Sequence, residues 1–306
     1  MNIIQRNILI LKGRGRMKKT LKLLSVIVMA FALCLSFAAC GGDDKPAEDA
    51  GTDTTEGTAD NGTFKVGMEC GYAPFNWTQI DDSNGAVALS DGSYAGGYDV
   101  EIAKIIADAL GKELEIVKTS WDGLPQALQS GTIDAIIAGM SATADRAETI
   151  DFSDLYYDSV LVMVVRADGD YADATSLADF SGAKVTGQLN TFHDSVVDQI
   201  PDVNHVTAME DFPAMRVALE SGVIDGYVSE RPEGLSAAAA NSNFAVVEFA
   251  DGEGFDYTPA DVAISVGLKK GSDDLKAEIN EILAGVSEDM RLDLMDQAVK
   301  NQPAAE

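Results

Sequence analysis

Cysteine and histidine are scarce in this chain, with three cysteines and two histidines among 306 residues. Metal sites need several such ligands at short spacing, and neither His193 nor His205 has a cysteine or histidine nearby in the sequence. Cys34 and Cys40 belong to the first 40 residues, so Cys70 has no disulfide partner in the rest. We therefore expect no metal, no cofactor and no disulfide, and a small buried hydrophobe at Cys70 rather than a reactive thiol.

Basic residues are also few, at 22 against 50 acidic ones. Seven of the 22 lie in the first 39 residues, which leaves 15 basic and 50 acidic residues in the remainder. Such a surface is repelled by nucleic acids and by anionic lipid headgroups. We therefore expect no nucleic-acid partner, and any attachment to a membrane must use acyl chains rather than charge.

The first 39 residues have the form of an export signal. Lys18, Lys19 and Lys22 precede the apolar run 23–39, which is short for a membrane span and ends in two alanines. Cys40 and two glycines follow, which resembles a bacterial lipobox, where the cysteine receives lipid and becomes the mature N-terminus. The alternative is an ordinary secretory signal cut after Ala39. Met17, followed by two lysines, favours 1–16 as a mis-assigned start.

The chain changes character after the signal. Residues 41–62 hold many acids and no large apolar side chain, which predicts a flexible tether between the lipid and the folded part. From Thr63 on, apolar runs alternate with amphipathic segments, as in α/β proteins. This alternation predicts parallel sheets covered by helices on both faces, with ligands at the carboxyl ends of the strands. The expected strands are 64–68, 114–117, 134–138, 161–165, 184–186, 206–207, 226–228 and 264–268, and the expected helices are 98–110, 123–129, one from 144, 176–180, 192–199, 212–221, 233–241, 273–285 and 288–299.

Arg146 occupies a position that helix physics disfavours. The segment 134–157, DAIIAGMSATADRAETIDFSDLYY, predicts a buried strand and then a short helix with a serine or threonine cap. Arg146 falls in the first turn of this helix, where free N–H groups already make the site electropositive. Broken local rules of this kind are enriched at functional sites. The alternative is a surface ion pair with Asp145 or Glu148.

Four segments, in this order, carry a resemblance to a known family: GYAPFNW (71–77), GGYDVEIAKIIADALG (96–111), SWDGLPQALQSGTIDAIIAGMSATADRAETIDFSDLYY (120–157) and ESGVIDGYVSERPEG (220–234). Together they resemble the polar amino-acid-binding family (family 3) of ABC-transporter solute-binding proteins, from about Thr63 to Val299. The resemblance implies a type II periplasmic-binding-protein-like α/β fold, with two lobes, two hinge strands and a ligand cleft between the lobes. It places lobe I at 63–157 plus 250–306 and lobe II at 158–249.

The resemblance also implies an anion receptor. Arg146 would hold the α-carboxylate of an amino acid as a bidentate fork, helped by N–H groups near Ser141. Across the cleft, the segment QLNT (188–191) ends a strand and opens a helix, so the N–H groups of Thr191 and Phe192 would form a second anion nest. Its asparagine stands where the family usually has glycine, and asparagine tolerates a left-handed turn.

A cation receptor follows from the same resemblance. The α-ammonium would lie against the Gly139 carbonyl, the Ser141 hydroxyl and the carboxylate of Glu230. Most relatives have aspartate at the last position, so the longer Glu230 shifts the ligand or recruits a water molecule. The alternative for Glu230 is a surface pair with the neighbouring Arg231.

Glu69, at the end of the first strand, is expected to set specificity. Tyr72 and Trp121 match positions that flank the ligand side chain, with Trp77 as a second wall and Phe75 in the core. A carboxylate between aromatic rings favours a guanidinium or an ammonium, and it also accepts a hydrogen bond from a glutamine amide. The sequence thus predicts a basic or polar L-amino acid, with a basic one preferred. The alternative is that Glu69 caps a turn outside the cleft.

We therefore predict a monomeric, lipid-anchored extracellular protein that delivers an amino acid to the permease of an ABC importer. It would lie on the outer face of the cell membrane, or in the periplasm of a Gram-negative source, and close by rotation at hinges near 157–160 and 247–251. One alternative is a ligand-sensing receptor component. The other is a dehydratase or lyase on the same scaffold, which the absence of G-x-S-x-G, P-loop and G-x-G-x-x-G motifs disfavours, so we expect no enzyme.

Overall fold

The computed structural model describes residues 62–303. The predictions for the export signal, for Cys40 and for the tether fall, except for Gly62, outside the described residues. Within 62–303, the helices are all too short or too polar to cross a bilayer.

Five strands form the first sheet, in the order β6-β1-β7-β14-β8. β6 and β7 run parallel to β1, whereas β14 runs antiparallel to both β7 and β8. The apolar run that predicts β1 is buried, with Phe64, Val66 and Met68 at 0% exposure, because β1 lies inside the sheet. The bounds are β1 (Thr63–Met68), β6 (Glu113–Lys118), β7 (Ala135–Ile136), β8 (Ile150–Asp158) and β14 (Ala263–Lys269).

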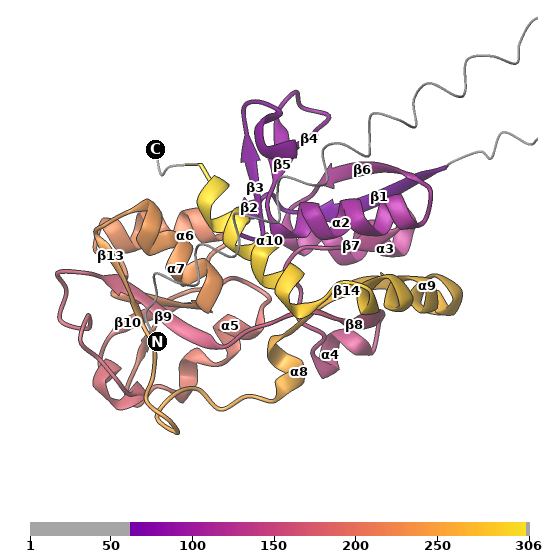
Figure 1. The fold of residues 1–306 in the computed structure, drawn as a ribbon. Helices are drawn as coiled ribbons and strands as arrows, with labels where there is room; N and C mark the ends of the chain where they lie inside the picture. The colour runs from indigo at the N-terminus through magenta and orange to yellow at the C-terminus, as the bar shows by residue number, and fades with distance from the viewer. Residues whose placement is uncertain (1–61, 304–306) are drawn as a thin grey trace, which may run out of the picture. The chain divides into compact units, whose positions relative to one another are not determined.

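Helices flank the first sheet (Figure 1). α2 packs on β6, α3 on β1, and α9 on β8. The amphipathic helix predicted at 98–110 is α2; Val100, Ile102 and Ile106 form its buried face, as their spacing requires. The bounds are α2 (Tyr98–Ala109), η3 (Trp121–Gly123), α3 (Leu124–Ser130), α4 (Ala144–Ala147), α8 (Pro259–Val262), α9 (Asp273–Ala284) and α10 (Glu288–Asn301).

A second sheet has the order β11-β10-β12-β9-β13. β10 runs parallel to β11 and β12, and β9 runs antiparallel to β12 and β13. The helix expected at 192–199 is divided into α5 and a 3-10 turn. The bounds are β9 (Leu161–Arg166), η4 (Leu177–Phe180), β10 (Lys184–Thr186), α5 (Phe192–Ser195), η5 (Val197–Gln199), β11 (Asn204–His205), α6 (Phe212–Glu220), β12 (Gly226–Glu230), α7 (Arg231–Ala240) and β13 (Phe244–Val247).

A small antiparallel sheet, absent from the sequence prediction, lies between β1 and α2 in the chain. Its strands have two to four residues, too few for a recognisable alternation of apolar and polar side chains. The 3-10 turn η2 (Ser83–Gly85) lies in the same segment. The strands are β2 (Gly71–Tyr72), β3 (Asn76–Gln79), β4 (Val87–Ala88) and β5 (Tyr94–Gly96).

The prediction of parallel sheets is wrong for part of each large sheet. The sequence missed β8 and β13, and both are antiparallel to their neighbours. The physical reason is the route of the chain, which leaves the first sheet along β8, enters the second along β9 and returns to the first through β14. A strand that enters a sheet in this way has no helical crossover to turn it parallel.

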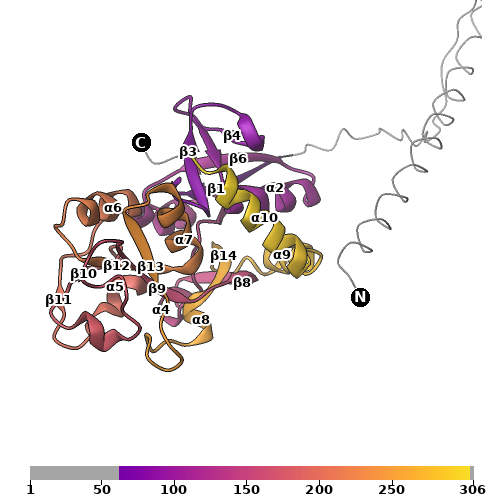
Figure 2. The ribbon, with the colours of Figure 1, turned by 60° about the vertical axis from the view of Figure 1, so that its left-hand side comes forward.

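Two clusters of apolar side chains form the core. The larger one contains β1 and α2 and extends to Phe212, while the smaller one packs around Phe180 and Val185. Phe255 and Val262 belong to the smaller cluster, so the chain packs with the second sheet beyond residue 250. α10 packs on α2 and extends toward α7, where Gln302 contacts a serine (Figure 2).

Candidate ligand-binding site

All nine residues that the sequence assigns to a ligand line one cavity of about 10 Å³, which is roughly the space of a single water molecule. They come from the small sheet, from β12 and from the loops and helices that follow strands of both large sheets, so a larger guest requires these parts to move apart. Two further residues, Gln188 and His193, line the same cavity. The nine are Glu69, Tyr72, Trp121, Gly139, Ser141, Arg146, Thr191, Phe192 and Glu230.

Arg146 lies on the short helix α4, as predicted, and Thr143 accepts a hydrogen bond from its backbone N–H at 3.4 Å. Its guanidinium donates to two carbonyl oxygens, that of Ser141 at 3.0 Å and that of Asn190 at 3.5 Å, and lies 5.1 Å from the centre of the Trp121 ring. Burial lowers the pKa of Arg146 to about 10, an effect that the nearby carboxylate of Glu230 only partly opposes.

The surface pair suggested as an alternative for Arg146 is wrong. Among the residues that the structure describes, no carboxylate lies within 4.0 Å of its guanidinium, and neither Asp145 nor Glu148 contacts it. The side chain is therefore a partly buried cation that only carbonyl oxygens and a ring face stabilise. This environment suits an anion that arrives with a ligand.

The turn opposite Arg146 has the predicted left-handed residue, since Asn190 adopts φ 57°. Its side-chain amide donates to Asp122 at 2.8 Å, which joins the turn to the segment before α3. The Thr191 N–H donates to the Gln188 carbonyl at 3.3 Å and is thus used inside the turn. The anion nest expected from Thr191 and Phe192 is therefore incomplete in this arrangement.

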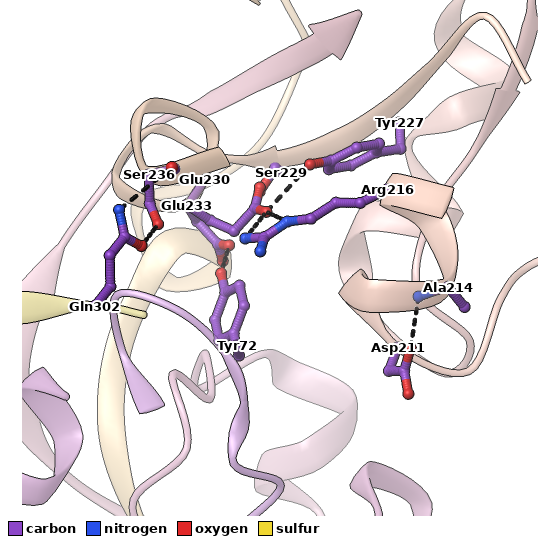
Figure 3. A network of polar contacts seen from close by, with 10 residues as sticks. All are labelled: Tyr72, Asp211, Ala214, Arg216, Tyr227, Ser229, Glu230, Glu233, Ser236 and Gln302. Carbon is purple, nitrogen blue, oxygen red and sulfur yellow. Dashed lines mark hydrogen bonds and ion pairs between the residues drawn. The ribbon is translucent and has the colours of Figure 1, made fainter. Parts of the chain in front are cut away.

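Glu230 ends β12 and is 1% exposed. Its Oε2 accepts hydrogen bonds from the Tyr72 hydroxyl and, at 2.9 Å, from Nε2 of His193 (Figure 3 shows Tyr72 pointing at Glu230). Burial alone would raise the pKa of Glu230, but the interactions with His193 and Tyr72 lower it below its usual value, so the carboxylate is ionised. The surface pair with Arg231 is wrong, because Arg231 pairs with Glu248 at 2.7 Å.

The aromatic side chains of the cavity have further aromatic neighbours. Tyr72 stacks on Phe212 and Phe75, with ring centres 4.4 and 5.0 Å away, and so forms a wall of three rings; Trp121 lines the same cavity. Trp77 is not part of this cavity; its Nε1 donates to Gln79 at 2.8 Å. Glycine is required at position 139, where φ is 62° and a Cβ would lie 2.6 Å from the Tyr72 ring.

Glu69 follows β1 and enters the cavity, so the alternative of a turn cap outside the site is wrong. Its Oε2 accepts a hydrogen bond from Nε2 of Gln188 at 3.0 Å, and its Oε1 is buried without a partner. Burial raises the pKa of Glu69 to about 7, against the lowering effect of Gln188. This carboxyl group is therefore close to half-ionised at neutral pH.

A buried network fixes the two strand ends that carry the site. Asp99, in the first turn of α2, accepts hydrogen bonds from Asn76 at 2.8 Å and from the Tyr156 hydroxyl at 2.7 Å. Asn76 in turn accepts from the Cys70 N–H at 2.8 Å, and the Tyr156 oxygen accepts from the Gly139 N–H at 3.2 Å. Burial raises the pKa of Asp99 to about 6. Cys70 is buried as predicted, and burial raises the pKa of its thiol to about 12, so it is no reactive thiolate.

Sequence reasoning missed Gln188 and His193 as lining residues. Gln188 lies in the segment that was read as an anion nest, but it reaches Glu69 through its side chain. His193 is the second residue of α5 and is 8% exposed. The signal that could have found it is its place just after the predicted turn.

The described globular region matches one family of known proteins. The family described as "Bacterial extracellular solute-binding proteins, family 3" matches residues 64–298. This chain belongs to that family.

Several relatives support the assignment. The ABC transporter glutamine-binding protein GlnH of Bacillus subtilis is 27% identical over 294 residues, which cover 94% of this chain and 100% of that protein. The L-cystine-binding protein TcyJ of Escherichia coli is 28% identical over 238 residues, covering 78% and 82%. Both are named as binding proteins and not as enzymes.

A solved structure extends the likeness to the fold. An amino acid ABC transporter substrate-binding protein from Streptococcus pneumoniae, bound to L-arginine, has a TM-score of 0.69 and 29% identity, and the match covers 78% of this chain and 94% of that one. These neighbours are two-lobed α/β proteins, which confirms the predicted fold class.

Proposed function

We propose that this solute-binding protein captures a basic or polar L-amino acid, with a basic one preferred, and delivers it to the permease of an ABC importer. The observation that carries the proposal is the balance of charge in the cavity. Arg146 has no carboxylate at ion-pair distance in the described part of the chain and suits the α-carboxylate, while Glu230 suits the α-ammonium. Glu69 adds a second carboxylate to a site with one arginine, and a cationic ligand side chain would neutralise it.

The names of the relatives support an amino acid as ligand without fixing which one. The relatives named above bind glutamine, cystine or arginine according to their descriptions. The charge balance favours the basic class among these. A second carboxylate that opposes one guanidinium disfavours an acidic side chain, because like charges in a partly buried site repel strongly.

Hydrogen bonds between the two sheets support closure around the ligand. Tyr72 bonds to Glu230, Glu69 to Gln188, and the Asn190 carbonyl accepts from Arg146, so residues from 69–146 bond to residues from 188–230 across the cavity. A ligand that replaces these partners would select the closed arrangement through its differential contacts. We propose lobe I at 63–157 plus 250–306 and lobe II at 158–249, with hinges near 157–160 and 247–251 and with Phe255 and Val262 packed on lobe II.

The proposal includes export and a lipid anchor at Cys40, followed by the acidic tether 41–62. Mass spectrometry of the mature N-terminus tests this part: a diacylated Cys40 is expected, and an unmodified N-terminus at that residue would contradict the anchor. The protein would then act as a monomer on the outer face of the membrane.

Calorimetric titration with the twenty L-amino acids tests the ligand class. We expect arginine or lysine to bind most tightly and glutamine less tightly. Tight binding of only aspartate, or of only aliphatic amino acids, would overturn the proposal.

A further inference from the structure

Two buried side-chain atoms in the described part of the chain have no hydrogen-bond partner. Glu69 Oε1 and His193 Nδ1 are its only buried side-chain nitrogen or oxygen atoms without a hydrogen-bond partner. Both residues line the candidate ligand cavity, although they come from opposite sheets. Because buried polar atoms are nearly always paired, two exceptions in one cavity indicate that a guest completes their hydrogen bonds.

The contact with Glu230 fixes the orientation of the His193 ring. Nε2 lies 2.9 Å from Glu230 Oε2, and the ring packs edge to face on Phe212, with centres 5.9 Å apart. Nδ1, on the other side of the ring, is buried and has no hydrogen-bond partner, and His193 is one of the residues that line the cavity. Glu230 therefore holds the ring through Nε2, and Nδ1 is left without a hydrogen-bond partner.

The contact with Glu230 also decides whether Nδ1 donates or accepts a hydrogen bond. The ionised Glu230 carboxylate can only accept a hydrogen bond, so Nε2 must carry the hydrogen. In the tautomer that carries its single hydrogen on Nε2, Nδ1 is an acceptor, and Glu69 Oε1 is an acceptor as well whenever Glu69 is ionised. The cavity therefore offers two unpaired acceptors and no matching donor.

Among amino-acid side chains, a guanidinium fits two acceptors best. It has five N–H donors in a planar fork and no acceptor, so two of its edges can serve Glu69 and His193 together. A carboxamide would turn its carbonyl oxygen toward one of the acceptors. An ammonium has three donors on one compact nitrogen and lacks the planar fork of a guanidinium.

We propose that His193 is a specificity-determining residue that, together with Glu69, selects a guanidinium side chain over an ammonium or a carboxamide. This inference rests on the proposed function and narrows its ligand class to arginine-like amino acids. Glu230 acts on specificity through His193, because its carboxylate fixes the tautomer of the ring.

The test is calorimetric titration at pH 8, where Glu69 is mostly ionised, with L-arginine, L-citrulline, L-lysine and L-glutamine. Citrulline has the shape of arginine with a carbonyl oxygen in place of one guanidinium nitrogen. The wild-type protein is expected to bind arginine at least about tenfold more tightly than each of the other three, since a hydrogen bond to a charged group is worth roughly that factor.

Two substitutions at His193 test the roles of its two ring nitrogens separately. His193→Gln keeps a donor for Glu230 and loses the acceptor at the Nδ1 position, whereas His193→Asn keeps an acceptor there and loses the reach to Glu230. We expect His193→Gln to weaken arginine about tenfold and to change lysine and glutamine less than about threefold. His193→Asn should retain the preference for arginine over lysine. Thermal unfolding of each variant checks that the fold is kept.

The results distinguish a failure of this inference from a failure of the proposed function. If the wild-type protein binds amino acids without preferring arginine over citrulline, or if His193→Gln weakens all four ligands equally, the role of His193 is refuted and the amino-acid function stands. If the wild-type protein binds no amino acid at all, the proposed function itself fails and this inference falls with it.

Discussion

Two arginines near the cavity, Arg216 and Arg146, have opposite surroundings. Arg216, on α6, donates to Glu233 Oε1 from Nη2 at 2.7 Å and from Nε at 3.1 Å. Glu233 is fully buried and also accepts hydrogen bonds from Tyr227 and Ser229 (Figure 3). Arg146 has two carbonyl oxygens and the face of a tryptophan instead.

The different neighbours shift the pKa values of the two arginines in opposite directions. Burial alone would lower the pKa of Arg216, but the charge of Glu233 raises it above its usual value. Burial lowers the pKa of Arg146 to about 10, because no comparable carboxylate lies close to it. A buried cation with its counter-ion stabilises the fold, whereas a buried cation without one is prepared for a ligand. The comparison thus separates a structural ion pair from an anion receptor by the chemistry of the neighbours alone.

The largest effect is expected on the structural side of the comparison. Arg216→Ala leaves Glu233 buried and uncompensated, which should lower the free energy of unfolding by about 3–5 kcal/mol. Denaturant unfolding with far-UV circular dichroism measures it. The double variant Arg216→Met with Glu233→Gln removes both charges and should recover much of the loss. A single-variant loss below about 1 kcal/mol would show that the pair does not hold this part of the fold.

On the receptor side, Arg146→Ala should act on binding and not on folding. Loss of two charge-assisted hydrogen bonds to an α-carboxylate should weaken the preferred amino acid at least about 100-fold, while the unfolding free energy changes by less than about 1 kcal/mol. Calorimetry and thermal unfolding on the same sample give both values. Arg231→Ala is the matched control, because Arg231 is exposed and paired with Glu248 outside the cavity. An affinity within threefold of wild type would remove Arg146 from the site.

The sequence correctly predicted the helices and strands that have a long pattern of apolar residues. The apolar run of β1, the amphipathic face of α2 and the two C-terminal helices were found close to their observed bounds. The pattern failed where tertiary pairing decides the structure. β8 reads IDFSDLYYD, a mixture without clean alternation, and its pairing with β14 at the edge of the sheet has two register shifts. Likewise, the strands β2 to β5 exist only through their mutual pairing.

For the candidate site, the residues could be predicted but the contacts between them could not. Its nine residues were located through the family resemblance, and they do line one cavity, but their partners were not foreseen. The contact of His193 with Glu230 joins the start of α5 to the end of β12. No local pattern encodes such a contact, since it depends on how two elements pack. The wall of Tyr72, Phe75 and Phe212 has the same origin.

A smaller effect concerns Glu69, the other incompletely paired charge of the cavity. Its pKa is raised to about 7, so the protein without ligand holds a proton on Glu69 below that pH and loses it above. A cationic ligand needs the carboxylate, so binding releases the proton and the affinity for arginine should rise with pH. Between pH 6.5 and 8 we expect an increase of about fourfold, measured by calorimetry. Glu69→Gln should make this profile flat; a wild-type profile that falls with rising pH would contradict the assignment of the proton.

The smallest effect tests a contact between two neutral side chains. Gln302, just after α10, donates from Nε2 to the Ser236 carbonyl at 3.3 Å and accepts from the Ser236 hydroxyl, so it joins the C-terminal helix to α7 (Figure 3). α10 packs on α2 beside the first sheet, and α7 carries Glu233 and follows Glu230 in the chain. If the contact exists only in the closed arrangement, Gln302→Ala should weaken the ligand about two- to threefold, the value of a partly exposed neutral hydrogen bond. Asn301→Ala, an exposed neighbour, is the control. A lower unfolding temperature with unchanged affinity would instead mean that Gln302 holds α7 in the open and closed arrangements alike, and that only the charged residues of the cavity govern closure.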